Sequence, residues 1–189
     1  MITVILGDIT TQHTTAIVNA ANTNLLAGGG VCGAIHAAAG PDLEKQCLRL
    51  GGCPTGEARI TSGYNLPAKF VIHAVAPKYW DGTRNEAKLL RSCYKAIFEI
   101  IKQKQISSVA IPAIVTGIYR FPIAEATSIA VEEARAAVDS LNLAITFCCF
   151  DKEALDVYKE IVATHGPTLQ SRICKITHED PVTALSLTS

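Results

Sequence analysis

A long stretch without charged side chains lies near the start of the chain. Residues 9–41 contain no Asp, Glu, Lys or Arg, yet they are too rich in Asn, Thr and Gly to form an ordinary hydrophobic core. Within this stretch, three consecutive glycines come directly before a segment whose apolar residues recur every three or four positions. The glycines are Gly28, Gly29 and Gly30, and the apolar residues are Val31, Ala34, Ile35, Ala38 and Ala39. The pattern predicts a glycine-rich turn that opens an α-helix.

Such a turn can bind an anion through its backbone. Glycines adopt positive φ angles and let a ligand approach the main chain closely. The first amides of a helix have no internal partner and the helix dipole adds partial positive charge, so a phosphate suits this place without a lysine. The segment matches neither GxxxxGK[ST] nor GxGxxG, the two common phosphate-binding patterns. On this feature alone, a purely structural turn stays the alternative.

The charge balance favours neither nucleic acids nor anionic membranes as partners. The chain has 17 Lys and Arg residues against 17 Asp and Glu residues, so any anion must be held locally. The seven cysteines show neither a CxxC motif nor zinc-type spacing with histidines, which indicates reduced thiols and no metal site. The start, MITVILGD, is typical of a strand rather than a signal peptide, and no apolar run reaches membrane length. We therefore expect a cytoplasmic protein.

Strand and helix patterns alternate along the chain. Strands are predicted at residues 2–6, 16–18, 57–61, 70–75, 108–112 and 143–150. Helices are predicted at residues 31–39, 42–50, 84–105, from Pro122 onwards and after Asp151 through Thr164, with Asp151 as a helix cap. The predicted strands at residues 57–61 and 70–75 flank a turn and should form a hairpin. The alternation predicts an α/β fold with helices on both faces of a largely parallel sheet.

The end of the chain follows a different pattern. Residues 166–189 contain turn formers and mixed charges without a sustained period, and chain ends are often loose. We therefore expect one domain at residues 1–165 and a C-terminal extension at residues 166–189, which is either ordered or disordered.

Four motifs follow one another in a specific order. They are GDIT at residues 7–10, NAANTNLLAGGGVCGAIHAAAG at 19–40, TSGYNLPAKFVIHAVAP at 61–77 and PAIVTGIYRFP at 112–122. Together they resemble the macrodomain family, and most closely its hydrolase branch of O-acetyl-ADP-ribose deacetylases and mono-ADP-ribosyl hydrolases. The resemblance covers about residues 1–162. It implies a three-layer α/β/α fold with a mixed, largely parallel central sheet.

The resemblance also implies a function. The protein would bind ADP-ribose and hydrolyse ADP-ribosyl esters, either of mono-ADP-ribosylated acidic side chains or of O-acetyl-ADP-ribose, without a metal or cofactor. Its partners would be ADP-ribose, its esters and mono-ADP-ribosylated proteins, with no membrane and no nucleic acid. An unrelated nucleotide-dependent α/β enzyme is a remoter alternative, and the absence of both phosphate fingerprints speaks against it.

The ligand-binding residues carry over from the family by position. Asp8 would accept the adenine amino group, the backbone of Ile9 would read the ring, and Phe150 would pack against it. Backbone amides of two loops would hold the diphosphate; these loops comprise Gly28, Gly29, Gly30 and Val31, and Thr116, Gly117, Ile118 and Tyr119. The alternatives are that Asp8 only ends a strand and that Phe150 is a core residue.

Two asparagines receive different roles. Asn22 lies where the family places an asparagine on the distal ribose, and an amide side chain suits sugar hydroxyls because it both donates and accepts hydrogen bonds. Asn19 is expected to tie the loop to its own backbone in an Asx-type turn.

One departure from the family affects catalysis. The hydrolase branch typically reads GGGVDGAIH, and its acidic residue is proposed to orient or activate water, but this chain has Cys32 there. A helix N-terminus favours the thiolate form of a cysteine and His36 follows one turn later, so a catalytic dyad is one option. An inert buried cysteine and a packed histidine are the alternative.

Hydrolysis without the acid stays open, because a ligand phosphate held by loop amides can position the water. The expected catalytic residues are therefore Asn22, Cys32 and His36. The alternative function is a non-catalytic ADP-ribose reader, because Cys32 replaces the acidic residue. A second departure is Arg120, where the family carries glycine; its guanidinium either strengthens diphosphate binding or points to solvent.

Overall fold

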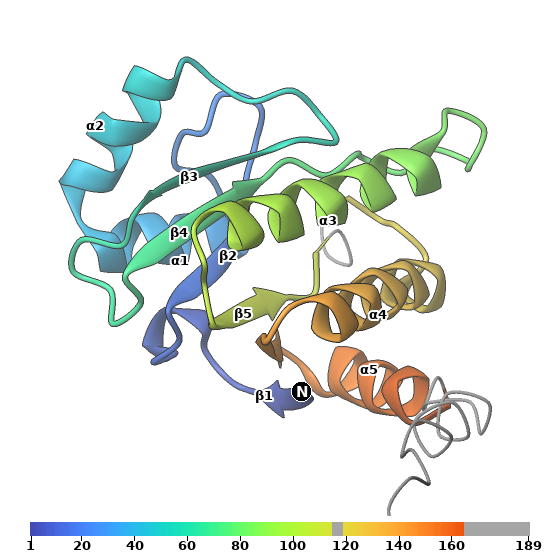
Figure 1. Cartoon of the computed structure of the whole chain (residues 1–189). Coiled ribbons are helices and arrows are strands. Elements are labelled where there is room, and N and C mark those ends of the chain that lie inside the picture. Colours follow the sequence, from blue (N-terminus) through green and yellow to red (C-terminus); the bar gives the residue numbers. More distant parts are fainter. Residues whose placement is uncertain (115–118, 165–189) are drawn as a thin grey trace, which may run out of the picture.

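A six-stranded sheet with the order β1-β6-β5-β2-β4-β3 runs through the middle of the molecule (Figure 1). The computed structural model describes residues 1–114 and 119–164. The strands are β1 (Ile2–Leu6), β2 (Ala16–Ala20), β3 (Ala58–Ser62), β4 (Phe70–Ala74), β5 (Ser108–Pro112) and β6 (Ala144–Cys149). All neighbouring strands are parallel except β3, which pairs antiparallel with β4 as the predicted hairpin.

Helices cover both faces of the sheet. They are α1 (Gly30–Ala39), α2 (Pro41–Leu50), α3 (Glu86–Gln103), α4 (Ile123–Ser140) and α5 (Lys152–Thr164), with a short 3-10 helix η1 (Ile9–Thr11) after β1. One buried cluster joins α1 and α2 to one face of the sheet, and a larger cluster joins α3, α4 and α5 to the other. The alternation of side chains along β2 explains this division, since Ile17 lies in the first cluster and Val18 in the second. The predicted α/β class with two covered faces is confirmed.

The predicted helix at residues 84–105 is too long at both ends. Asn85 adopts a left-handed φ of 60°, so α3 begins at Glu86. Gln105, with φ of 52°, lies beyond its other end. Periodicity could not reveal these ends, because Asn and Gln are compatible with helical spacing and only their backbone angles interrupt it. The predicted cap of α5 is confirmed, since Asp151 Oδ1 accepts a hydrogen bond from the Ala154 amide at 2.8 Å.

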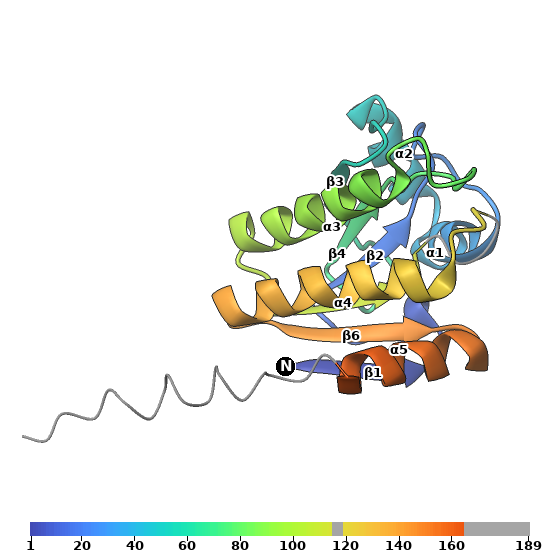
Figure 2. The same cartoon turned by 90° about the vertical axis from the view of Figure 1, so that its right-hand side faces the viewer.

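The carboxyl ends of the parallel strands meet at one edge of the sheet. The segments that follow β2, β4 and β5 therefore lie at the same end of the molecule, as Figure 2 shows for the starts of α1, α3 and α4. This edge is where open α/β sheets bind ligands. The expected C-terminal extension, residues 166–189, lies outside the described residues. Within the described ranges, every helix is too short or too polar to cross a bilayer.

Candidate functional site

The glycine turn before α1 packs closely against the helix on one side and is open on the other. A Cβ atom added to Gly33 would lie 2.3 Å from the carbonyl oxygen of Gly28, so only glycine lets the helix approach the loop this closely. A Cβ atom on Gly29 or Gly30 would meet nothing within 4 Å. No side chain caps the helix start. The turn therefore presents uncapped backbone amides to open space, which suits an anionic ligand.

Asn22 shapes the loop that leads to this turn. Its Oδ1 accepts hydrogen bonds from the amides of Asn24 at 3.1 Å and Leu26 at 3.2 Å. Its Nδ2 donates to the Leu26 carbonyl at 2.7 Å. This is the local turn-forming role that the sequence analysis assigned to Asn19, so that assignment was wrong. Asn22 is also half-buried and keeps a second Nδ2 hydrogen, which can serve a ligand.

Asn19 has a different position because β2 extends to Ala20, two residues beyond the predicted strand. In the parallel register Asn19 lies opposite His73 of β4. Both side chains point toward the α1 and α2 side of the sheet, and the Asn19 Nδ2 lies 3.1 Å from His73 Nδ1. The same amide nitrogen donates to Cys32 Sγ at 3.6 Å. Asn19 thus joins two strands to the first turn of α1.

His73 is held as a neutral ring. It is fully buried, and this burial lowers its pKa to about 3, with a smaller contribution from His36. Because the Asn19 amide donates to Nδ1, we place the ring proton on Nε2, which lies 2.9 Å from the hydroxyl of Thr61. The ring therefore connects β2, β4 and β3 through two hydrogen bonds.

His36, Cys47 and His73 have the residue types of a metal site, and one ligand atom from each lies within 4.8 Å of the others. However, both ring nitrogens of His73 already have hydrogen-bond partners. Cys47 Sγ lies 3.7 Å from His73 Nε2, so the thiol belongs to the same hydrogen-bonded group. We interpret the group as a buried polar network, and the absence of a resident metal stays a prediction.

Cys32 and His36 are close along the helix but are not hydrogen-bonded to each other. The Cys32 thiol is 5% exposed and donates to the Leu26 carbonyl at 3.5 Å. His36 is 7% exposed, and neither of its ring nitrogens has a partner among the described residues. Burial lowers the pKa of His36, and the charge of Glu44 opposes this shift. The geometry therefore does not assemble the dyad that the sequence offered as one option.

Asp8 and Phe150 lie side by side at the edge where β1 and β6 end. The Gly7 amide donates to the Cys149 carbonyl at 2.9 Å, which brings the two strand ends together. Asp8 is exposed, and only its Oδ1 is used to cap η1, through the amide and hydroxyl of Thr10 at 2.8 and 2.7 Å. Phe150 is 90% exposed, so the alternative of a core residue is wrong. Ile9 is buried beside them.

The second predicted loop is described only at its end. Thr116, Gly117 and Ile118 lie outside the described residues. The Tyr119 carbonyl accepts a hydrogen bond from the Tyr79 amide at 3.0 Å. Burial raises the pKa of Tyr119, and Cys32 makes a smaller contribution in the same direction.

Arg120 adopts a strained backbone conformation. Its φ is 55°, in the left-handed region that favours glycine, and its side chain is exposed. Strain of this kind at the rim of a ligand site is consistent with a functional role for the side chain. The structure leaves the guanidinium free to reach either a ligand or solvent.

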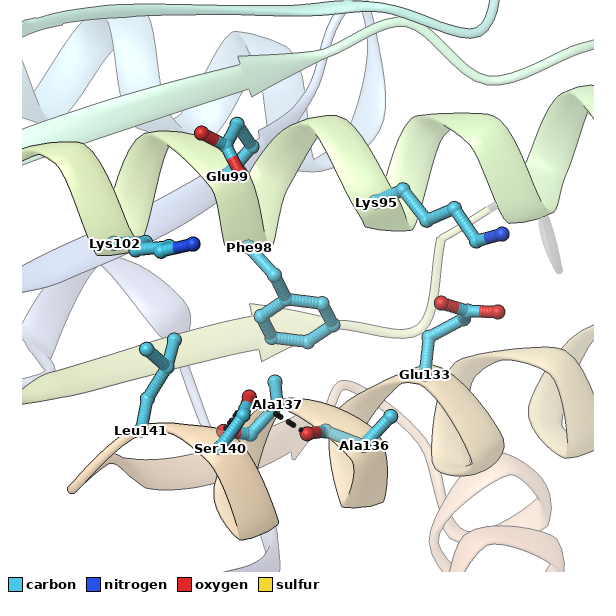
Figure 3. Close-up of a pocket in the computed structure, with 9 residues that line it drawn as sticks. All are labelled: Lys95, Phe98, Glu99, Lys102, Glu133, Ala136, Ala137, Ser140 and Leu141. Atoms are coloured by element: carbon cyan, nitrogen blue, oxygen red, sulfur yellow. Dashed lines mark hydrogen bonds between the residues drawn. The ribbon is translucent and has the colours of Figure 1, made fainter.

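A groove with a volume of about 350 Å³ lies between α3 and α4. Figure 3 shows the charged side chains that surround Phe98 in this groove. Ser140 and Leu141, which line it, come directly before β6 and thus lie at the opposite edge of the sheet from the glycine turn. A second hollow of about 450 Å³ borders the turn itself and is lined by Ala27, Gly28, Gly33, His36, Ala37, Gly40, Pro41 and Glu44. We therefore place the site at the carboxyl edge of the sheet.

Comparisons with known proteins identify relatives of this chain. A family model described as Macro domain matches residues 18–130. A macro domain-containing protein of Mesorhizobium japonicum is 49% identical over 83% of this chain and 90% of its own length. A macro domain-containing protein of Chlorobaculum tepidum is 48% identical over 86% of this chain and 96% of its own length.

Solved structures have the same fold. The Oceanobacillus iheyensis macrodomain with ADP superimposes with a TM-score of 0.79 at 39% identity and covers 91% of both chains. The Trypanosoma brucei macrodomain in complex with ADP-ribose also reaches a TM-score of 0.79, at 38% identity, over 85% of this chain and 68% of that one. These likenesses confirm the predicted three-layer α/β/α architecture.

Substituting Gly33 tests whether its close approach shapes the turn. Gly33→Ala should lower the free energy of unfolding by about 1–3 kcal/mol, because its Cβ must displace the Gly28 carbonyl. Gly29→Ala is the matched control, since Gly29 has an ordinary φ of −86° and an open Cβ position. Denaturant unfolding of both variants measures the difference. Equal losses of stability in the two proteins would contradict this explanation.

Acid should destabilise the fold through His73. Burial lowers the pKa of His73 from 6.5 to about 3. At pH values between these two, the His73 ring is protonated in the unfolded chain and neutral in the folded chain. Stability from this residue is fully present above pH 6.5 and is lost as the pH falls toward 3. The slope should reach at most about 1.4 kcal/mol per pH unit. Urea unfolding across this pH range measures it.

Substitution of His73 provides the control for this pH dependence. His73→Gln should flatten the slope, whereas His13→Gln, at an exposed position, should leave it unchanged. A slope in the His73→Gln protein as steep as that of the parent would show that other groups cause the acid sensitivity.

Proposed function

This chain belongs to the macrodomain family, and we propose that it binds ADP-ribose and hydrolyses ADP-ribosyl esters. The observation that carries the proposal is the open, uncapped turn before α1 in a stretch without charged residues. Such a turn can hold a diphosphate through amides alone. Its solved relatives with ADP and with ADP-ribose support this class of ligand.

The diphosphate would lie between two loops. Amides of Gly28, Gly29, Gly30 and Val31 would bind it from one side, and Thr116, Gly117, Ile118 and Tyr119 from the other. Gly29 and Gly30 of the first group face open space. The hydrogen bond from Tyr79 to the Tyr119 carbonyl leaves the Tyr119 amide unused by that contact. This arrangement requires neither lysine nor metal.

Adenine would lie at the edge formed by Asp8, Ile9 and Phe150. Since Asp8 uses only Oδ1 to cap η1, its Oδ2 is available to accept the adenine amino group. The exposed ring of Phe150 would lose contact with water when it packs against the base. Asn22 would donate its remaining Nδ2 hydrogen to a hydroxyl of the distal ribose.

The proposed reaction is attack by water on the ester. The water oxygen bonds either to the ester carbonyl carbon or to the anomeric carbon, the corresponding C–O bond breaks, and ADP-ribose and a carboxylic acid leave. A diphosphate oxygen held by the loop amides would accept a hydrogen bond from this water and position it. Cys32 donates a hydrogen bond to the Leu26 carbonyl, and the His36 ring nitrogens have no partner among the described residues. The two side chains would therefore act on the placement of the loop and water rather than as a dyad.

A second candidate function is a reader that binds ADP-ribose without hydrolysis. The observation that favours it is Cys32, a buried thiol at the position of the family's acidic residue. A thiol that donates to the Leu26 carbonyl supplies no general base.

Binding is tested by calorimetry with ADP-ribose, AMP and ATP. Gly29→Glu should weaken ADP-ribose binding by about tenfold or more, because a carboxylate then faces the diphosphate. Gly29→Ala should bind like the parent, and Asp8→Ala should lose about threefold to tenfold through the missing adenine contact. If folded Gly29→Glu and Asp8→Ala proteins bind ADP-ribose as well as the parent, the ligand lies elsewhere.

Hydrolysis is tested by single-turnover release of ADP-ribose from a protein that is modified on glutamate. The parent should release ADP-ribose slowly, and Cys32→Asp should accelerate release by about tenfold to a hundredfold by restoring an acid–base group. Asn22→Ala should be slower than the parent, with melting curves to separate this effect from misfolding. An inactive parent that is revived by Cys32→Asp would establish the reader instead.

A further inference from the structure

Hydrogen bonds to a buried carboxylate hold the backbone of the segment between β4 and α3. Glu86 is 1% exposed, and its two oxygens accept hydrogen bonds from three backbone amides of this segment. The donors are Trp80 at 3.2 Å, Gly82 at 3.3 Å and Arg84 at 2.6 Å. Because these bonds order the backbone of an exposed loop, its side chains are presented to solvent in a defined arrangement.

The side chains of this segment form an aromatic and positively charged surface. Trp80 is 65% exposed, and the Arg84 guanidinium lies 4.5 Å from the centre of its ring. Lys78 and Arg84 are exposed in the segment, and Arg120 is exposed on the neighbouring one. We call Lys78, Trp80, Arg84 and Arg120 the cationic rim. Residues 77–85 and 119–122 contain one acidic residue, Asp81, and its side chain is exposed.

The cationic rim adjoins the proposed ADP-ribose site. The Tyr79 amide donates to the Tyr119 carbonyl at 3.0 Å, and the Tyr79 and Phe121 rings lie 4.8 Å apart. Tyr119 ends the second diphosphate loop of the proposed function, and Cys32 makes a small contribution to the raised pKa of its hydroxyl. Figure 2 shows the segments before α3 and α4 at the same end of the molecule as α1. The rim therefore borders the end of the site that holds Cys32, and Asp8 and Phe150 mark the adenine end.

We propose that the cationic rim binds acidic side chains that flank an ADP-ribosylated glutamate or aspartate, so that the protein prefers modified sites in acidic sequences. This inference rests on the proposed function. The glycine turn and residues 9–41 carry no charge and recognise only the ADP-ribosyl group. Discrimination between protein sequences must then come from the rim, where cations attract acidic neighbours and Trp80 supplies apolar contact area.

Charge complementarity favours an acidic peptide as the occupant. The net charge of the whole chain is zero, so the attraction is local to the rim and not a general affinity for polyanions. The ester linkage itself places the ligand on a carboxylate side chain. In the proposal, the residues next to that side chain leave the site over the segment of Tyr79, which contacts Tyr119 and Phe121. Three exposed cations beside an exposed aromatic ring suit a short acidic segment in extended form.

The test uses two synthetic peptides that carry ADP-ribose through a hydrolysis-resistant linkage on one glutamate. One peptide has Glu and Asp on both sides, and the other has Ser and Gly. Calorimetry at low salt should show the acidic peptide binding about fivefold to tenfold more tightly, because each exposed ion pair adds a modest gain. The preference should fall to less than about twofold in 1 M salt.

Variants connect the preference to the rim. Lys78→Gln combined with Arg84→Gln should bring the two peptides to equal affinity and leave the affinity for free ADP-ribose unchanged. Lys102→Gln is the matched control, because Lys102 is an exposed cation in the last turn of α3, at the opposite end of that helix. It should keep the full preference.

The outcomes separate the two proposals. A parent that does not bind free ADP-ribose would overturn the proposed function. A parent that binds free ADP-ribose but shows equal affinity for both peptides would overturn the role of the cationic rim alone. A preference for the acidic peptide that survives in the Lys78→Gln, Arg84→Gln protein would also overturn it.

Discussion

The contact between Gly33 and the Gly28 carbonyl is the constraint on which the site depends. It brings the first turn of α1 against the loop from β2, so that the loop has a tightly packed inner side and an open outer side. Asn22 secures the approach to this loop with three hydrogen bonds. In the proposed function the binding groups are backbone amides, which can hold an anion although this stretch of chain carries no charge.

Local features of the fold could be predicted from the sequence. Strand and helix periodicity located the elements, and the cap of α5 followed from Asp151 directly before an apolar period. The glycine turn was recognisable because three glycines come directly before an apolar helical period, although this feature alone did not separate a binding turn from a structural one. The two ends of α3 were missed. The left-handed backbone angles of Asn85 and Gln105, which lie just outside the helix, leave no mark in the apolar periodicity.

Long-range features of the site could not be predicted. Asn19 and Asn22 are the same residue type in one motif, and only the pairing of Asn19 with His73 across two strands separates their roles. The bond from His73 to Thr61 likewise depends on the hairpin register. Residue type and helical spacing suggested that Cys32 and His36 act together, but the Cys32 thiol donates its hydrogen bond to the Leu26 carbonyl. Strand register and loop closure determine these contacts, and neither can be inferred from the spacing of residues along the chain.

Trp80 belongs to the ordered segment held by Glu86, and its indole ring provides a fluorescence signal for following binding. Trp80 is the only tryptophan of the chain, so the entire indole emission originates at one border of the site. Fluorescence intensity and quenching by small anions therefore report on that border without an attached dye. The adenine end of the proposed site contributes no indole signal, so in an unlabelled sample this fluorescence reports on the surroundings of Trp80 alone.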